Sequence, residues 1–354
     1  MKDENDNDFH PGSRQAAMAG KVLFPDEAGE VKYRGVTWGY IGDHESFEEL
    51  GYPHHANNQF CAECGCEQTT RDNPDNPMAW NYFGRGCAWP GTRGAAVRWR
   101  NPLMDIIGFC QAMMLHDVLH NLDQGVTLHV IGNILFYYSY YKPGAPADNF
   151  QALAQRLQEL YVEDGVSDRI NMFKLSTIGS ATSPMAEYPI LHHAKAAETR
   201  HLAPVLLKLV EEKMAGGGAT LEEQHQRLCL DMLCRIYSVI CNGGVILSDA
   251  EARQLQDCVW VLNAEYSWLA RNAFEHRRLM WSQVPKFHFL YHLGVQSRWL
   301  NPLMSWTYSA ESFVGKISRI GLACSRGTAS TKVGSSVLEK WLVAYFMLLT
   351  RLNV

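Results

Sequence analysis

The sequence has no run of apolar residues long enough to cross a membrane, which takes roughly 20 in a helix. The best candidate, Gly125–Tyr141, is broken by polar residues such as Thr127 and His129. The first ten residues, Met1–His10, are acidic and polar, whereas a secretory signal begins with basic and then apolar residues. We therefore expect no membrane association and an intracellular protein.

Other absences narrow the class of protein further. The chain shows no internal repeat, no low-complexity tract, no helix-turn-helix signature, no second CxxC pair and no basic run typical of a nuclear signal. What is present is a chain of 354 residues, 47% hydrophobic and 19% charged, which excludes a disordered or collagen-like protein. This composition predicts a globular protein with a core large enough for one large domain or two.

Charge is distributed unevenly along the chain. Residues 263–354 carry eleven Lys or Arg and four acids, a net charge of +7, whereas the whole chain has a net charge of −5. The preceding residues therefore carry a net −12. The basic end is consistent either with contact to a polyanion such as DNA or with a solvated surface of scattered charges.

The pattern of apolar residues predicts a predominantly α fold with a few strands (α+β). Residues 1–30 form a polar lead-in, and residues 31–101 hold a strand segment, Val31–Ile41, which ends at Gly42-Asp43, followed by a Cys-rich loop. We expect residues 102–284 to be helical and residues 285–354 to form a strand-helix segment. The helices expected are one from about 102 to about His120, a buried one after it, and Asn149–Val162, Glu198–Lys213, Leu221–Cys241, Ser248–Leu269, Ala310–Leu322 and Ser336–Leu352, with a strand at Ser305–Tyr308.

The sharpest local motif is a cysteine cluster made of Cys61, Cys64, Cys66 and Cys87. The two-residue gap between Cys61 and Cys64 lets both thiolates reach one tetrahedral ion, and a later ligand can close the shell. The sequence therefore predicts a structural Zn²⁺ in this loop. The alternative is a loop of reduced thiols, because only one CxxC pair is present.

A second cluster is His116-Asp117-Val118-Leu119-His120. Two histidines four apart on a helix share a face, as in the HExxH helix of zinc proteases, where the acid between them acts as a base. Here Asp117 stands where Glu is expected. The alternative is a mostly buried helix whose histidines are satisfied by hydrogen bonds.

A third cluster lies near the basic end. It begins at Lys286, His288 and His292 and continues to the run Trp306–Phe313, which contains Glu311 and is followed by Lys316 and Arg319. An acid flanked by aromatic and basic residues suits a divalent cation beside a phosphate backbone. Alternatively, Glu311 is a carboxylate in the first turn of a helix, stabilised by the helix dipole.

Three segments together resemble the transposases of CACTA (En/Spm-type) DNA transposons and their relatives in protist genomes. Asp117–His120 looks like that family's Asp-x-x-His helix, followed by its apolar helix at Val130–Leu135. Ala194–Val205 is similar to a helix that typically reads Lys-x-His-Asp and then Leu-Leu-Pro-Val, although the His-Asp pair is replaced here. The block from Pro285 to Glu311 looks like the family's His-Leu, its aromatic-rich strand and its Glu-x-aromatic helix. Order and spacing carry the resemblance, which covers roughly residues 105–340.

The resemblance implies a partial RNase H-like core with a large helical insertion, which cuts and rejoins DNA with two Mg²⁺ ions held by three carboxylates. Glu311 matches the third acid and Asp43 the second, while Asp117 and His120 support the site. The cysteine cluster fits a CxxC-bearing loop of many relatives. No match to the first acid is present, which implies a truncated copy that is inactive alone and becomes a DDE-type nuclease only if the missing part is supplied.

The resemblance also implies DNA as a partner and a nuclear location. With the basic end, it makes four residues candidates for DNA contact: Lys286, Lys316, Arg319 and Arg326. A homo-oligomer is consistent with the helix-rich, aromatic-rich sequence. Two other functions stay open, a non-catalytic helical scaffold or binding protein with a structural zinc, and a metal-dependent hydrolase that uses His116 and His120.

Overall fold

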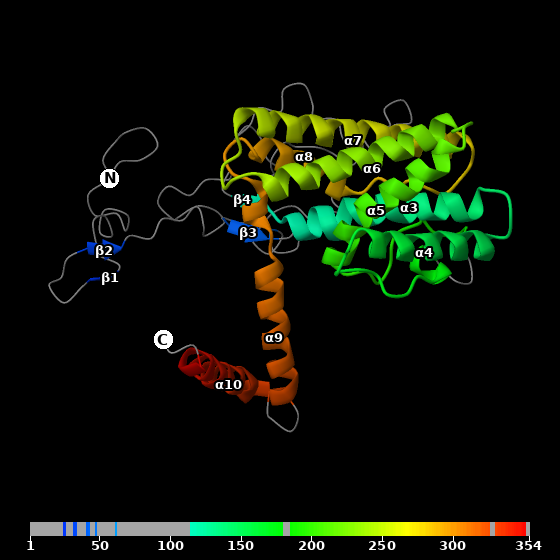
Figure 1. The fold of residues 1–354 in the computed structure, drawn as a ribbon. Helices are drawn as coiled ribbons and strands as arrows, with labels where there is room; N and C mark the ends of the chain where they lie inside the picture. Colours follow the sequence, from blue (N-terminus) through cyan, green and yellow to red (C-terminus); the bar gives the residue numbers. More distant parts are fainter. Residues whose placement is uncertain are drawn as a thin grey trace. The chain divides into compact units, whose positions relative to one another are not determined.

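A computed structural model gives the fold, which is mostly helical (Figure 1). The structure describes residues 24–25, 31–33, 40–42, 47, 61, 114–179, 185–325 and 330–351. A predominantly α fold with a few short strands is therefore confirmed. Of the predicted site residues, Asp43, Cys64, Cys66, Cys87 and Arg326 lie outside the described residues.

The described strands are short and the helices are long. The strands are β1 (Phe24–Pro25), β2 (Val31–Tyr33), β3 (Tyr40–Gly42) and β4 (Met114–His116). The helices are η4 (Leu119–Val126), α3 (Thr127–Tyr140), α4 (Pro146–Glu163), η5 (Leu175–Thr177), α5 (Ala196–Ala215), α6 (Leu221–Asn242), α7 (Asp249–Glu275), α8 (Pro285–Gln296), η6 (Pro302–Ser305), α9 (Tyr308–Ser325) and α10 (Ser330–Arg351).

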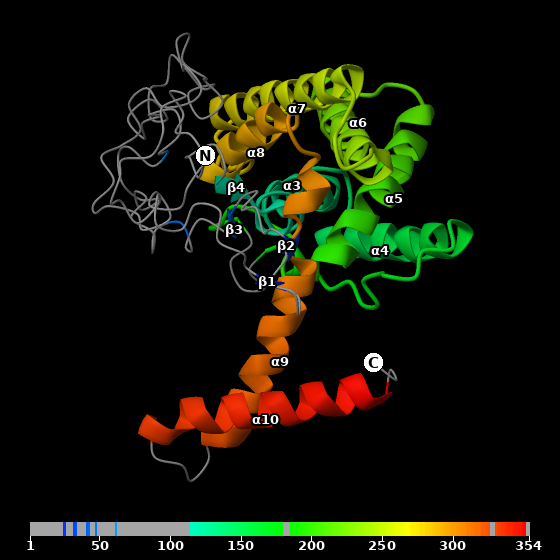
Figure 2. The same cartoon turned by 90° about the vertical axis from the view of Figure 1, so that its left-hand side faces the viewer.

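The structure divides into two compact units, Met1–Trp306 and Thr307–Val354. In the first, α3 runs through the core and is contacted by α4, α5 and α6, while α6 and α7 pack on each other (Figure 1). Figure 2 shows α3 nearly end-on, with α7 above it and α4 to one side. Helix α3 is buried almost all round, so its sequence is mostly apolar, and its polar residues Thr127, Asn133 and Ser139 are buried as well.

Capping explains where the two longest helices of this unit begin. The Thr220 hydroxyl accepts from the backbone N–H of Glu223, whose carboxylate accepts from the N–H of Thr220. Ser248 and Glu251 repeat this reciprocal arrangement at the start of α7. These capping boxes satisfy N–H groups that have no partner within the helix, and they are visible in the sequence.

The strands form two separate pairs. β1 and β2 are antiparallel, and β3 and β4 are parallel. The register of the parallel pair is Tyr40↔Met114, Ile41↔Leu115 and Gly42↔His116. Because the pair is parallel, Gly42 and His116 end their strands at the same edge.

Three expectations about secondary structure are corrected. The helix expected from about 102 to His120 is wrong at Met114–His116, which is strand β4. The strand expected at Ser305–Tyr308 is wrong as well, because η6 ends at Ser305 and α9 begins at Tyr308. The helix α8 was not expected. A short run of apolar residues has no periodicity that distinguishes a strand from a helix. Contacts with residues distant in the sequence therefore determine which of the two forms.

The second unit consists of α9 and α10, which pack on each other. Glu311 and Lys316 lie on α9, but their side chains are outside the described part. Arg319 on α9 is exposed. Among the described residues, no helix is both long enough and apolar enough to span a bilayer.

Candidate metal centre and the strand edge beside it

Helix α8 presents two buried histidines on one face. His288 and His292 are one helical turn apart, are 0% and 3% exposed, and their Nε2 atoms are 3.0 Å apart. The thiol of Cys61, 1% exposed, lies 3.3 Å from Nε2 of His292. The three potential ligand atoms all lie within 4.8 Å of one another. We call these three residues the Cys/His cluster.

Aromatic rings surround one side of the Cys/His cluster. The ring of His116, in β4, stacks on Phe289 of α8 with the ring centroids 4.7 Å apart and an interplanar angle of 23°. The ring centroid of His116 also lies 5.3 Å from that of Phe47 and 6.1 Å from that of His292. Phe47, His116 and Phe289 are all buried. The histidines of the Cys/His cluster therefore lie on the part of α8 that packs against β4, next to buried aromatic rings.

The structure combines two motifs that the sequence analysis kept apart. Cys61 was predicted as a zinc ligand with Cys64, Cys66 and Cys87, whereas His288 and His292 were assigned to a phosphate-facing segment. The helical spacing of the two histidines would have shown that they share a face, had Pro285 been read as the first residue of a helix.

The second feature is the edge where β3 and β4 end. Asp117 follows β4 directly and is 0% exposed. Its Oδ1 accepts from the N–H of Leu119 at 3.0 Å, and its Oδ2 accepts from the N–H of His120 at 3.1 Å. These are the bonds of an N-capping residue, so Asp117 starts the helix that follows the strand.

The carboxylate of Asp117 also contacts the imidazole of His120 through Oδ2 and Nδ1. The side chain of His120 is 27% exposed. A carboxylate against Nδ1 fixes the orientation of an imidazole and stabilises its protonated form. The pair His116 and His120 does not share one helix face, because His116 belongs to the strand and His120 to the helix.

The helix begun by Asp117 is interrupted about two turns later. Gln124 and Gly125 have non-helical dihedrals, and the ammonium of Lys286 donates to the carbonyl of Gln124 at 3.0 Å. A Cβ added at Gly125 would meet Cδ of Lys286 at 2.7 Å. Lys286, a predicted DNA contact, thus also joins α8 to the kink in η4.

Lys286 also affects a half-buried histidine on α3. Burial lowers the pKa of His129 to about 4, and the positive charge of Lys286 adds to the effect. His129 is therefore neutral at neutral pH.

The buried carboxylate of Asp123, in η4, binds two side chains that are distant in the sequence. It accepts from the hydroxyl of Tyr237 at 2.7 Å and from the indole N–H of Trp306 at 2.9 Å. The guanidinium of Arg200 lies over the Trp306 ring, 4.6 Å from its centroid. A buried carboxylate with two strong donors is stable in place. We interpret this network as structural.

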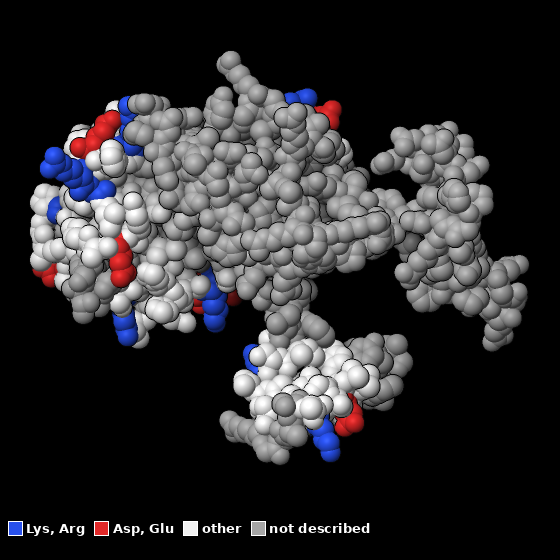
Figure 3. Space-filling view, turned by 180° about the vertical axis from the view of Figure 1, so that it is seen from behind, with Lys and Arg blue, Asp and Glu red and all other residues white. Residues whose placement is uncertain are grey.

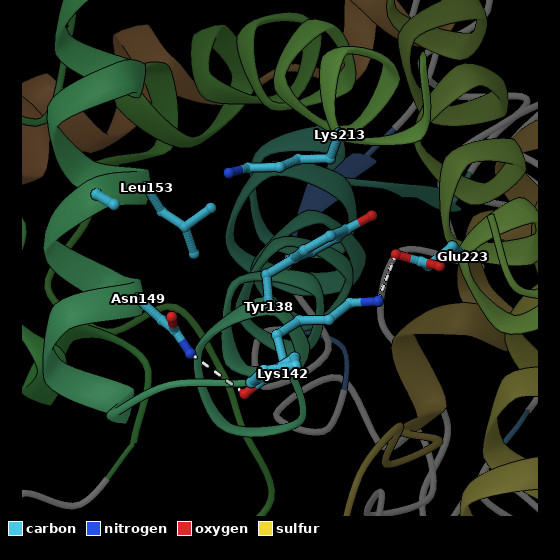
Figure 4. Close-up of a pocket in the computed structure, with 8 residues that line it drawn as sticks. Tyr138, Lys142, Asn149, Leu153, Lys213 and Glu223 are labelled. Carbon is cyan, nitrogen blue, oxygen red and sulfur yellow. Dashed lines mark hydrogen bonds and ion pairs between the residues drawn. The ribbon is translucent and has the colours of Figure 1, made fainter. Parts of the chain in front are cut away.

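A surface cavity of about 340 Å³ lies away from both features, between α3, α4 and the start of α6 (Figure 4). Lys142 and Glu223 form an ion pair of 2.7 Å across it. Burial, with the nearby Glu223 carboxylate, raises the pKa of Tyr138. Two lysines, Lys142 and Lys213, and one acid, Glu223, line the cavity, and the ion pair leaves the charge of Lys213 without an acid among the lining residues.

The described surface is mixed in charge. In Figure 3, Lys and Arg alternate with Asp and Glu over the described part of this face, and neither sign collects into one patch.

Comparison of the chain with models of protein families, with curated proteins and with solved structures found no match. Function therefore has to be argued from the residues and their geometry.

Proposed function

We propose that this chain is a transposase-derived protein that binds DNA at the edge where β3 and β4 end. The supporting observation is the parallel pairing that sets Gly42 opposite His116. In sheets with parallel strands, ligands are bound outside the carboxyl ends of the strands. Asp43 follows Gly42 in the sequence and Asp117 follows His116, so acidic residues come directly after both strands.

The two acids have different functions in this proposal. Asp117 uses both carboxylate oxygens on backbone N–H groups and on the ring of His120, which supports a positioning role rather than magnesium ligation. Asp43 and Glu311 are the proposed Mg²⁺ ligands, as the resemblance to CACTA transposases implies. The chain alone lacks the first acid and is inactive in this proposal; with that acid supplied, two Mg²⁺ ions would activate the attacking hydroxyl and stabilise the leaving oxygen of the DNA phosphate.

The basic C-terminal quarter supports DNA as the partner. Of the candidate contacts, Arg319 is exposed on α9, and Lys286 lies in the first turn of α8. Lysine and arginine that neutralise phosphates release counterions, so binding of this kind weakens steeply with salt. A nuclear location and a possible self-association belong to the same proposal.

The direct test is binding of the full chain to a fluorescent duplex, measured by anisotropy between 50 and 200 mM salt. We expect the affinity to fall by about tenfold or more over this range, the behaviour of a protein that contacts several phosphates. Arg319→Ala should reduce the slope of log affinity against log salt concentration by about one, the contribution of one phosphate contact. Binding that is independent of salt, or absent at low salt, would contradict a DNA-binding function.

The metal part of the proposal has its own test. Mn²⁺, a spectroscopic substitute for Mg²⁺, should bind the full chain in the presence of the duplex. We expect Asp43→Asn and Glu311→Gln each to weaken this binding by about tenfold or more, since each removes a charged ligand. Asp249→Asn, which changes an exposed acid in the first turn of α7, is the matched control. Equal effects of all three changes would count against the assigned ligands.

The Cys/His cluster favours a second candidate function, a helical scaffold or binding protein without catalysis. A buried cluster of this kind can hold a fold together without any substrate. The two candidates differ in outcome. A chain that retains zinc but binds neither duplex DNA nor Mn²⁺ is a scaffold, whereas the transposase-derived protein binds both.

A further inference from the structure

We propose that Cys61, His288 and His292 bind one Zn²⁺ ion that fastens the Cys61 segment to helix α8. The inference concerns a site different from the DNA-facing edge and does not depend on the proposed function. It adds two histidines far along the chain to Cys61, the one described member of the ligand set expected from the cysteine spacing.

The distances fit a tetrahedral zinc ion. With Zn–N bonds of about 2.05 Å and a Zn–S bond of about 2.3 Å, neighbouring ligands stand about 3.3 Å apart for two nitrogens and about 3.6 Å for nitrogen and sulfur. The structure has 3.0 Å between the two Nε2 atoms and 3.3 Å between Sγ of Cys61 and Nε2 of His292. A small outward movement of each ligand admits the ion.

Hydrogen bonding alone explains the arrangement less well. The Nε2 atom of His292 lies within hydrogen-bonding distance of both the thiol and the other imidazole. A neutral imidazole nitrogen carries either one N–H or one lone pair, so Nε2 of His292 makes one good hydrogen bond and only a shared contact with the second neighbour. A zinc ion instead uses all three lone pairs at once, with the thiol as thiolate.

The ligand types select a transition metal. One thiolate and two imidazoles suit zinc or copper, whereas Mg²⁺ and Ca²⁺ prefer oxygen ligands, and zinc is the ion that we propose. The ligands are almost fully buried, and Phe289 lies on the same helix as the histidines. A structural zinc has four protein ligands, so the three described side chains leave one position of the tetrahedron to a further ligand.

The ion would join segments that are distant in the sequence. Cys61 and His292 are 231 residues apart. Closing so long a loop restricts the unfolded chain strongly. Since His116 of β4 stacks on Phe289 of α8, the same ion would also steady the strand that leads to Asp117. The sequence offers Cys64, three residues after Cys61, as a further thiolate, but the inference rests on the three described side chains.

The test is the zinc content of the purified full chain, measured by elemental mass spectrometry. We expect about one zinc per chain, falling at least tenfold in Cys61→Ser and in His292→Phe. Cys258→Ser and His225→Gln, which alter a cysteine and a histidine outside the Cys/His cluster, are controls that should keep it. A wild-type chain without zinc, or variants that keep it undiminished, would overturn the inference.

Two further measurements cover variants that fail to fold. His292→Cys replaces one zinc ligand by another and should restore zinc binding that His292→Phe loses. Reconstitution of the wild-type chain with Co²⁺ should give the strong visible absorption of a tetrahedral ion and a thiolate-to-cobalt charge-transfer band. Weak absorption of an octahedral ion without that band, or equal zinc loss in the Cys and Phe variants, would contradict the assignment.

Discussion

Two pairs of histidines in this chain have the same spacing and opposite structures. His116 and His120 were expected on one helix, yet His116 ends strand β4 and His120 lies in the helix that follows. His288 and His292 were not expected on a helix, yet they share one face of α8 and meet Cys61. A spacing of four residues predicts a metal site only where both residues belong to a helix.

The first prediction tests the comparison with the largest expected effect. Removal of zinc by a chelator should destabilise the wild-type chain by about 4 kcal/mol, the contribution of a ligand present at a thousandfold excess over its dissociation constant. In a domain of this size that corresponds to a fall of roughly 10 °C in Tm. Differential scanning calorimetry with and without the chelator measures it.

The two histidine pairs serve as each other's control in this experiment. His288→Ala should already have the lower Tm and should not respond to the chelator. His116→Gln, which changes a ring near the Cys/His cluster but not a ligand, should still respond. If His116→Gln abolishes the response and His288→Ala keeps it, we have chosen the wrong pair.

The second prediction concerns His129, a third type of histidine environment. Its pKa is about 4 in the folded protein and 6.5 in an ordinary setting. As pH falls from 6.5 to about 4, the unfolded chain gains a proton that the folded chain does not, so stability falls. The loss approaches about 3 kcal/mol below pH 4, at 1.36 kcal/mol per pKa unit.

Urea unfolding between pH 7 and pH 4 measures this dependence. His129→Leu, which cannot titrate, should lose less stability than the wild type over the same range. An identical fall in both proteins would show that other groups govern the acid sensitivity and that His129 does not remain neutral in the fold.

The third prediction concerns the corner between β4 and the following helix. Asp117→Ala removes the cap of that helix and should lower the free energy of unfolding by about 1–2 kcal/mol. Asp117→Asn keeps an oxygen for one backbone N–H and should cost less. Urea unfolding compares them, with Asp249→Ala as control, because Asp249 is an exposed acid at another helix start. Equal stability of Asp117→Ala and wild type would contradict the capping role.

The fourth and smallest expected effect is that of Lys286. Lys286→Met removes the hydrogen bond to the Gln124 carbonyl and should cost about 1 kcal/mol. It should also raise the pKa of His129, because a positive neighbour is lost. Titration of the His129 ring by NMR measures the direction. A lower pKa in this variant would contradict the electrostatic coupling.

Much of the helical fold could be predicted from the sequence. The helices α4, α5, α6 and α7 lie close to their expected ranges, because their apolar positions recur with the helical period and because Thr220 and Ser248 form capping boxes. The strand pairing could not be predicted. β3 and β4 are three residues each, and each exists only because the other supplies its hydrogen bonds.

The candidate site was predicted in pieces rather than as a whole. Cys61 was proposed as a metal ligand from its CxxC spacing, and His288 and His292 were singled out for another chemistry. Their meeting depends on the tertiary packing of α8 beside β4, which local spacing does not contain. Whether Cys64, Cys66 or Cys87 also binds metal stays a prediction, because these residues lie outside the described part of the chain.

X-ray absorption at the zinc edge of the purified full chain tests the central claim most directly. We predict a first shell with at least one sulfur at about 2.3 Å and two imidazole nitrogens at about 2.0–2.1 Å. A chain that carries both His288→Phe and His292→Phe should lose the imidazole signal. A shell of sulfur alone, or of oxygen alone, would contradict a zinc site built from Cys61, His288 and His292.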